Sequence, residues 1–200
     1  MMKAVLAALA KLITGAGARW LGCAPDTRQR VYFANHASNL DALVIWAALP
    51  PPVRALTRPV AARDYWSKGR VRPYLAHHIF NALLIERKKP TMTDNPLKDM
   101  LTAMGDRHSL IIFPEGGRQT GGEMAPFKSG LYHLAKHRPD VELVPVLIEN
   151  LNRILPKGEF LPVPVLGGVN FGVPVKLEPG EGKEGFLQRT QAAIKEMIRP

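Results

Sequence analysis

Residues 31–41 read Val-Tyr-Phe-Ala-Asn-His-Ala-Ser-Asn-Leu-Asp. The first four are apolar, and three of them are β-branched or aromatic, which favours a short buried strand that ends near Asn35. The residues that follow predict a helix over 38–49, because the three prolines at 50–52 cannot continue one. A strand that passes within a few residues into a helix is typical of α/β domains.

The rest of the chain repeats this alternation of short apolar segments and helical patterns. We expect further strands at 83–85, 110–113, 143–148 and 168–175, and further helices at 95–104, 129–137 and 186–198. The last two strands each contain a proline, which indicates an edge, an end or a bulge. The pattern predicts a single α/β domain with a mixed, mostly parallel central sheet flanked by helices. Candidate polar groups follow strand carboxyl ends, where such sheets usually hold ligands.

The composition fits one domain with an excess of positive charge. Two hundred residues suffice for one core, and Lys plus Arg total 27 against 17 acids, a formal charge of +10. This charge attracts anionic partners such as nucleic acid, anionic lipid or phosphorylated substrates like coenzyme A. The one cysteine, Cys23, excludes an internal disulfide and a cysteine-based metal cluster. The basic and aromatic segment 54–72 suits either nucleic acid or a lipid headgroup layer.

Segment 1–22 is predicted to be an amphipathic helix that precedes the main domain at 23–200. Its apolar side chains share one face of a helical wheel, with Lys3, Lys11 and Thr14 opposite. Lys11 also interrupts what would otherwise resemble a signal peptide, and no apolar run reaches the length of about 18 residues typical of a membrane span. We expect the helix either to pack on its own domain or to lie in the membrane interface, and the wheel does not separate the two.

His36 and Asp41 could form a catalytic pair. On one continuous helix they would lie about 140° apart, but a strand end followed by a helix start turns the chain between them. A carboxylate on one ring nitrogen fixes the histidine tautomer and leaves the other nitrogen free to take a proton. The competing interpretation is a capping box of Ser38 and Asp41 beside a buried histidine.

Three further segments follow residues 35–41, and their order along the chain decides how each is interpreted. Residues 113–118 read Phe-Pro-Glu-Gly-Gly-Arg, in which glycines allow close approach of a ligand and Arg118 suits phosphate, although a tight turn would also explain them. Residues 84–87 end in Arg87, which alone indicates only a solvated basic face. Residues 144–148 form an apolar strand with a proline.

In this order, the four segments resemble the blocks of the glycerolipid acyltransferase family that includes the 1-acylglycerol-3-phosphate acyltransferases. The family's NHxSxxD block is matched at every fixed position by residues 35–41. Its second block ends in an apolar stretch and an arginine, here Arg87, and its third, usually FPEGTRS, is matched at 113–116 and at Arg118. The proline strand and the Phe-Lys-x-Gly run at 127–130 add to a resemblance that covers roughly 31–175.

The resemblance implies a role for each matched residue. His36 is expected to act as general base on the acceptor hydroxyl, with Asp41 as its orienting partner. The expected substrate-binding residues are Arg87, Glu115, Gly116, Arg118 and Lys128, with the arginines on a phosphate. Gly117 and Gln119 replace the threonine and serine that are common in the family, so two hydroxyls that could contact the headgroup of the acceptor are absent. Direct attack on a thioester needs no acyl-enzyme, so Cys23 is expected to be a bystander.

The sequence therefore predicts an O-acyltransferase that uses acyl-CoA or acyl-carrier protein as co-substrate, with no cofactor and no metal. Lysophosphatidic acid is the leading acceptor, and another lyso-lipid or glycerol-3-phosphate is the alternative. We expect a peripheral protein on anionic lipid at the cytoplasmic face of the cell membrane, without nucleic acid as partner. The rival hypothesis is a non-enzymatic basic module that binds anionic lipid or nucleic acid. His133 and His137 are spaced like metal ligands, but the sequence offers no third ligand.

Overall fold

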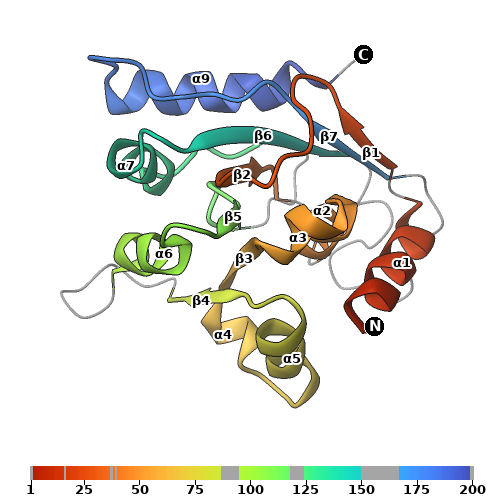
Figure 1. Ribbon diagram of the computed structural model, residues 1–200. Coiled ribbons are helices and arrows are strands. Elements are labelled where there is room, and N and C mark those ends of the chain that lie inside the picture. The colour runs from red at the N-terminus through yellow and green to blue at the C-terminus, as the bar shows by residue number, and fades with distance from the viewer. Residues whose placement is uncertain are drawn as a thin grey trace.

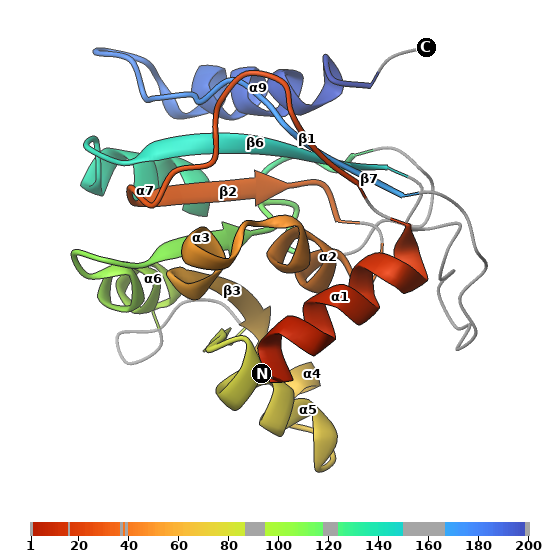
Figure 2. The same ribbon diagram turned by 45° about the vertical axis from the view of Figure 1, so that its right-hand side comes forward.

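Seven strands form one sheet in the described part of the chain, which comprises residues 2–15, 17–36, 38, 40–86, 95–117, 124–149 and 167–198 of the computed structural model (Figures 1 and 2). The strand order is β1-β7-β6-β2-β5-β3-β4. Their bounds are β1 Gly17–Trp20, β2 Arg30–Ala34, β3 Thr57–Ala62, β4 Leu83–Ile85, β5 Ser109–Ile112, β6 Glu142–Glu149 and β7 Gly168–Phe171. Neighbours are parallel except β6 and β7, so the predicted mixed, mostly parallel sheet is confirmed.

Helices cover both faces of this sheet (Figure 2). One layer contains α1 Met2–Thr14, α2 Asp41–Ala48, α3 Pro51–Ala55, α4 Arg63–Trp66, α5 Val71–Tyr74 and the π-helix η1 Leu75–Ile79. The other contains α6 Pro96–Met104, α7 Gly130–His137 and α9 Lys183–Lys195. The central strand β2 feeds both cores, because Tyr32 and Ala34 point into the first layer while Val31 and Phe33 point into the second. All four side chains are fully buried, as expected for a strand between two helical layers.

Most predicted elements are confirmed to within a few residues. The start of α6 has the expected cap, because the Asn95 side chain accepts hydrogen bonds from the backbone N–H groups of Leu97 and Lys98 at 3.1 and 3.4 Å. Gly105 ends that helix with a φ of 46°. Two strands were not predicted: β1, which lies in the expected N-terminal helix, and β3, which lies in the basic segment 54–72.

Pro145 shows which of the three expected settings for a strand proline applies. It lies in β6, which has neighbours on both sides, so it is not at an edge. Val146 pairs with Phe171 and Leu143 bridges to Val175, so two residues of β6 face three residues of the opposite segment. This mismatch is a bulge, and a bulge tolerates a residue without a backbone N–H.

Segment 1–22, expected to be one helix, contains a helix and a strand. α1 ends at Thr14, and β1 pairs in parallel with β7 at the edge of the sheet. The chain leaves the helical path near Gly15, whose φ is 58°. None of the described helices combines the length and the apolar character that crossing a bilayer requires.

α1 packs on the domain through its small side chains. Ala7 and Ala10 are buried in the core cluster that also contains α2, while Met2, Val5 and Leu9 are 53, 55 and 49% exposed. α1 therefore packs on the domain, but Val5 and Leu9 of the predicted apolar face take no part in this packing. Met2, Val5 and Leu9 are exposed, whereas Leu6 packs against the core, and the place of the exposed three in a membrane interface stays a prediction.

Candidate active site

The first and third sequence segments meet at the carboxyl edge of the sheet. β2 and β5 are parallel neighbours in which Phe33 pairs with Ile112, so the residues that follow each strand leave the sheet side by side. The ring of His36 stacks on the ring of Phe113, with centroids 4.3 Å apart and planes inclined by 24°. Phe113 thus fixes the plane of the imidazole, a contact that its position in the motif does not reveal.

His36 and Asp41 form the predicted pair. His36 Nδ1 lies 2.8 Å from Asp41 Oδ2, and the Asp41 side chain is fully buried while that of His36 is 22% exposed. A buried carboxylate on Nδ1 favours the tautomer that carries its proton there. The other nitrogen, Nε2, makes no hydrogen bond to any residue that the structure describes.

The same Asp41 oxygen also stabilises the start of α2. The backbone N–H of Ser38 donates to Asp41 Oδ2 at 2.9 Å, and the backbone N–H of Leu40 donates to Ser38 Oγ at 3.2 Å. The bond from Ser38 N–H to Asp41 is one half of the capping box that the competing interpretation expected, although α2 begins at Asp41 with Leu40 as its N-cap and has no side-chain cap there. One carboxylate oxygen therefore serves both purposes, and the capping and pairing interpretations are compatible.

Glu115 lies beneath the site with both oxygens bonded to backbone. Its Oε1 accepts the N–H of His36 at 2.7 Å, and its Oε2 accepts the N–H of Ala125 at 2.9 Å. The residue is 5% exposed. The carboxylate therefore links the residues after β2, the turn after β5 and the segment before α7. Its expected contact with the acceptor stays a prediction, and these bonds point to a positioning task that sequence reasoning missed.

Asn35 continues the sheet with its side chain. Its Nδ2 donates to the carbonyl of Ile148 at 3.1 Å, and its Oδ1 accepts the N–H of Ile148 at 2.8 Å. The amide takes the place of a backbone partner beyond the end of the β2–β6 ladder, which stops at the pair Ala34–Val146. His36 therefore follows a residue that is fixed to the neighbouring strand.

Gly116 and Lys128 are in contact beside the pair of His36 and Asp41, which we call the dyad. Gly116 has a φ of 71°, and a Cβ at this position would collide with the side chain of Lys128. The lysine backbone is held by its own bond, N–H to the Pro114 carbonyl at 2.8 Å. The structure thus brings Glu115, Gly116 and Lys128 together with His36 and Asp41.

The two expected phosphate-binding arginines, Arg87 and Arg118, lie outside the described residues. The strand before Arg87, β4, ends at the same edge of the sheet as β2 and β5, because these strands run parallel. Glu86, the last described residue before it, has its carboxylate 3.7 Å from Arg63 Nε.

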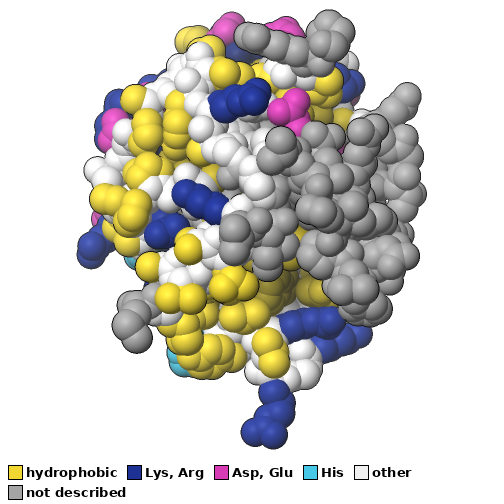
Figure 3. Space-filling view, turned by 90° about the vertical axis from the view of Figure 1, so that its right-hand side faces the viewer, with side chains coloured by type: hydrophobic (Ala, Val, Ile, Leu, Met, Phe, Trp, Pro, Cys, Tyr) yellow, Lys and Arg dark blue, Asp and Glu magenta, His cyan; other side chains and the backbone are white. Residues whose placement is uncertain are grey.

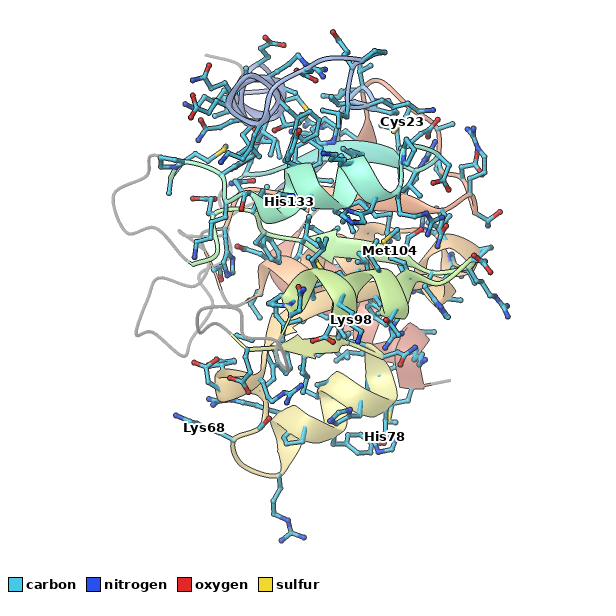
Figure 4. The ribbon with its side chains drawn as sticks, turned by 90° about the vertical axis from the view of Figure 1, so that its left-hand side faces the viewer. Cys23, Lys68, His78, Lys98, Met104 and His133 are labelled. Carbon is cyan, nitrogen blue, oxygen red and sulfur yellow. The ribbon has the colours of Figure 1, made fainter. Side chains whose placement is uncertain are left out.

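The remaining candidates take no part in this site. His137 Nδ1 lies 2.8 Å from the backbone carbonyl of His133 on the opposite helical layer (Figure 4), and the described residues contain no group of three His, Cys, Asp or Glu placed to share a metal ion. Cys23 packs against the core on the side of α1, and burial raises the pKa of its thiol. A groove of about 750 Å³ runs between α9 and the residues after β7, along the first half of β6, away from the dyad.

Comparison with known proteins yields the same family as the motifs. A family model described as "Acyltransferase" matches residues 23–149, which include the whole site. A crystal structure of the 1-acyl-sn-glycerophosphate (LPA) acyltransferase PlsC from Thermotoga maritima superposes with a TM-score of 0.74 at 18% identity, covering 98% of this chain and 77% of that one. At this identity the match supports the fold alone.

Several curated sequences are also similar. The 1-acyl-sn-glycerol-3-phosphate acyltransferase of Limnanthes douglasii is 32% identical over 156 residues, which are 76% of this chain and 52% of the relative. The enzyme of the same name from Escherichia coli K12 is 28% identical over 137 residues, covering 62% of this chain and 51% of the relative. The chain thus spans about half the length of the curated relatives it matches.

Proposed function

The chain belongs to the acyltransferase family, and on this premise we propose that it transfers a fatty acyl group from acyl-CoA or acyl-carrier protein to the free hydroxyl of lysophosphatidic acid, giving phosphatidic acid. The observation that carries the proposal is the His36–Asp41 pair, with 2.8 Å between Nδ1 and Oδ2 and with Nε2 turned away from the carboxylate. The names of the relatives support this acceptor and a place in phospholipid biosynthesis.

In the proposed reaction, His36 is the general base. Its Nε2 takes the proton of the acceptor hydroxyl while that oxygen attacks the thioester carbonyl, and the buried Asp41 stabilises the imidazolium that forms. The tetrahedral intermediate then collapses, the carbon–sulfur bond breaks, and the proton passes from Nε2 to the leaving thiolate. The products are the ester and the free thiol, and no side chain of the protein is acylated. Backbone N–H groups near the start of α2 are candidates to stabilise the oxyanion.

Positive side chains would hold the acceptor. Arg87 and Arg118 are proposed to bind its phosphate in bidentate fashion, as the family motifs imply. Lys128 adds a third cation, and its contact with Gly116 supports a place for it at the site. Gly116 itself leaves room for the Lys128 side chain, which a Cβ would displace.

The proposed place of action is the surface of the cytoplasmic membrane. A lyso-lipid acceptor resides in a membrane, and the exposed Met2, Val5 and Leu9 of α1 could enter its interface. A test of this helix should remove residues 1–14 only, because a longer deletion would also remove β1 from the sheet.

Mass spectrometry of products tests the function. The purified protein would be offered a panel of lyso-lipids and glycerol-3-phosphate, with acyl-CoA or acyl-carrier protein as donor. We expect phosphatidic acid from lysophosphatidic acid, and a loss of about 10²-fold or more in turnover for His36→Ala, since general bases commonly contribute about 10²–10⁴.

The matched variant is Asp41→Asn. Its amide oxygen can still accept the Ser38 N–H, so α2 should keep its start while the charge behind His36 is lost. Near-full activity of Asp41→Asn would refute the paired mechanism. Binding of anionic lipid without acyl transfer from any donor would instead favour the non-enzymatic module.

A further inference from the structure

A second surface element accompanies α1 on the outside of the molecule. Residues 63–82, which we call the α4–α5 lobe, contain α4, α5 and η1 and connect β3 to β4 (Figure 1). The lobe projects from the end of the sheet, and Lys68 and His78 on it lie at the far end of the molecule from His133 (Figure 4). It contains none of the proposed catalytic or substrate-binding residues.

The lobe is anchored from the inside by aromatic side chains. Phe80 makes edge contacts with Trp66 at 6.0 Å and with Trp46 of α2 at 5.1 Å between ring centroids. The π-helix buries Ala76 and Ile79, and Ile79 belongs to the same core cluster as Phe80 and Trp46. The core therefore holds the lobe through these residues and does not use the outer side of α5.

The outer side of α5 is apolar and meets α1. Val71 is 68% exposed and Tyr74 is 45% exposed, although both are large hydrophobic residues. The Tyr74 hydroxyl lies 3.8 Å from the sulfur of Met2, so α5 contacts α1 at a residue that is exposed together with Val5 and Leu9. We call these five residues the α1–α5 face. They are five of the eight exposed large hydrophobics among the described residues.

The elements that form the α1–α5 face carry an excess of positive charge. α1 and the lobe together carry six lysines and arginines, namely Lys3, Lys11, Arg63, Lys68, Arg70 and Arg72, against one acid, Asp64. Figure 3 shows hydrophobic side chains gathered in the lower part of this side of the molecule, with lysine and arginine side chains along its lower border. Arg72 also lies over the Tyr65 ring at 4.3 Å, which leaves the lobe with an aromatic and basic rim.

A membrane interface with anionic lipid fits this combination. Apolar side chains beside a basic rim enter the headgroup region, where lysine and arginine meet lipid phosphate and tyrosine is favoured. A nucleic acid would be matched by the charge but not by Val71 and the apolar side of α1.

We infer that α5 enters the membrane interface together with α1, so that the protein docks on anionic lipid through two separate elements. The inference rests on the proposed function, which places the acceptor in a membrane. Two points of attachment fix the tilt of the domain on the bilayer. With α1 alone in the interface, the domain would be free to rotate about the axis of that helix. The lobe would thereby set the height at which the carboxyl edge of the sheet meets the lipid.

Vesicle flotation with matched variants tests the inference. Val71→Asp removes an apolar contact and adds a charge of the same sign as the lipid, while Val173→Asp does the same at a valine of equal exposure, 67%, near α9. We expect Val71→Asp to weaken binding to phosphatidylcholine vesicles containing phosphatidylglycerol by about tenfold or more, and Val173→Asp to leave it unchanged. Leu9→Asp should weaken it comparably, and both variants should keep the wild-type unfolding midpoint because the side chains are exposed.

The charged rim is tested in the same way. Arg70→Gln and Arg72→Gln should each weaken binding to these vesicles by about fivefold. Lys183→Gln and Lys195→Gln on α9 are the controls and should have no effect. Vesicles of phosphatidylcholine alone should bind the wild type weakly, with little further loss in the arginine variants.

Three results would overturn the inference. The first is vesicle binding by Val71→Asp at the wild-type level, and the second is an equal loss of binding in Val173→Asp. The third is a change in oligomeric state of Val71→Asp with vesicle binding retained, which would assign the face to a second copy of the chain. Flotation uses no substrate, so it decides this point even if the wild type transfers no acyl group. Val71→Asp should transfer the acyl group to a short-chain, water-soluble acceptor at the wild-type rate. If the wild type itself shows no such transfer, the result contradicts the proposed function and not the docking inference.

Discussion

Glu115→Gln replaces one carboxylate oxygen by an NH₂ group where both oxygens accept backbone N–H groups. The amide can keep one of the two bonds, so either the N–H of His36 or that of Ala125 is left facing another donor. A hydrogen bond to a charged group contributes about 1.5–3 kcal/mol, and the bond that remains is weakened by the loss of charge. We therefore expect a destabilisation of about 3 kcal/mol, or about 10 °C in Tm for a domain of this size.

The catalytic effect of this substitution follows from the backbone of His36. If the N–H loses its acceptor, the imidazole shifts relative to the turn, and a misplacement of about 1 Å can cost about 10²-fold in rate. Initial rates with varied acceptor, measured well below the unfolding transition, should show a fall in kcat with little change in KM. Glu115→Asp should behave similarly, because it keeps the charge but is too short to reach both N–H groups.

The expectation from the family motif gives a different result. If Glu115 binds the acceptor, Glu115→Gln should raise KM for the acceptor while Tm and kcat stay at the wild-type values. That outcome would refute the positioning argument. Glu184→Gln, an exposed glutamate on α9, is the control for the loss of one negative charge.

Three further predictions concern other residues. Arg87→Ala and Arg118→Ala should raise the KM for a phosphorylated acceptor by about tenfold or more and leave the KM for a phosphate-free acceptor unchanged. Lysine at either position should not fully restore binding, because its ammonium group cannot form the two parallel hydrogen bonds of a guanidinium; equal wild-type activity on both acceptors would contradict this prediction. Asn35→Asp keeps the shape of the side chain but sets a carboxylate against the Ile148 carbonyl, so urea unfolding should show a loss of about 2 kcal/mol, and a loss below about 0.5 kcal/mol would be inconsistent with the bonds described. Cys23→Ala should keep activity within about twofold of the wild type. Iodoacetamide should label the wild-type thiol slowly, because burial raises the pKa of that thiol. Fast labelling that abolishes activity would rule out a bystander role for Cys23.

Features set by neighbouring residues could be predicted from the sequence. The Asn95 cap, the strand before Asn35 and the pairing of His36 with Asp41 all depend on residues a few positions apart, where periodicity, capping and turn chemistry are informative. The mostly parallel sheet follows from the alternation of strands and helices.

Features set by distant residues could not be predicted. The bond from His36 to Glu115 spans 79 positions, and the bond from Asn35 to Ile148 spans 113, so no local pattern reveals either. β3 was hidden because its arginine and proline do not resemble an apolar strand, although Pro59 is buried. The helix wheel of segment 1–22 failed beyond Thr14 because sheet pairing with β7 overrides helical periodicity.

The closeness of His36 and Asp41 along the chain has a consequence for how the protein responds to motion. Both residues belong to the short segment 36–41, which connects the end of β2 to the first turn of α2. Movement of the sheet should therefore displace them together and change their separation little. Gly116 and Lys128 reach the same place from other parts of the chain, and their positions depend on how those parts stay packed. As the domain begins to unfold on heating, substrate binding should therefore weaken before the hydrogen bond between His36 and Asp41 is lost.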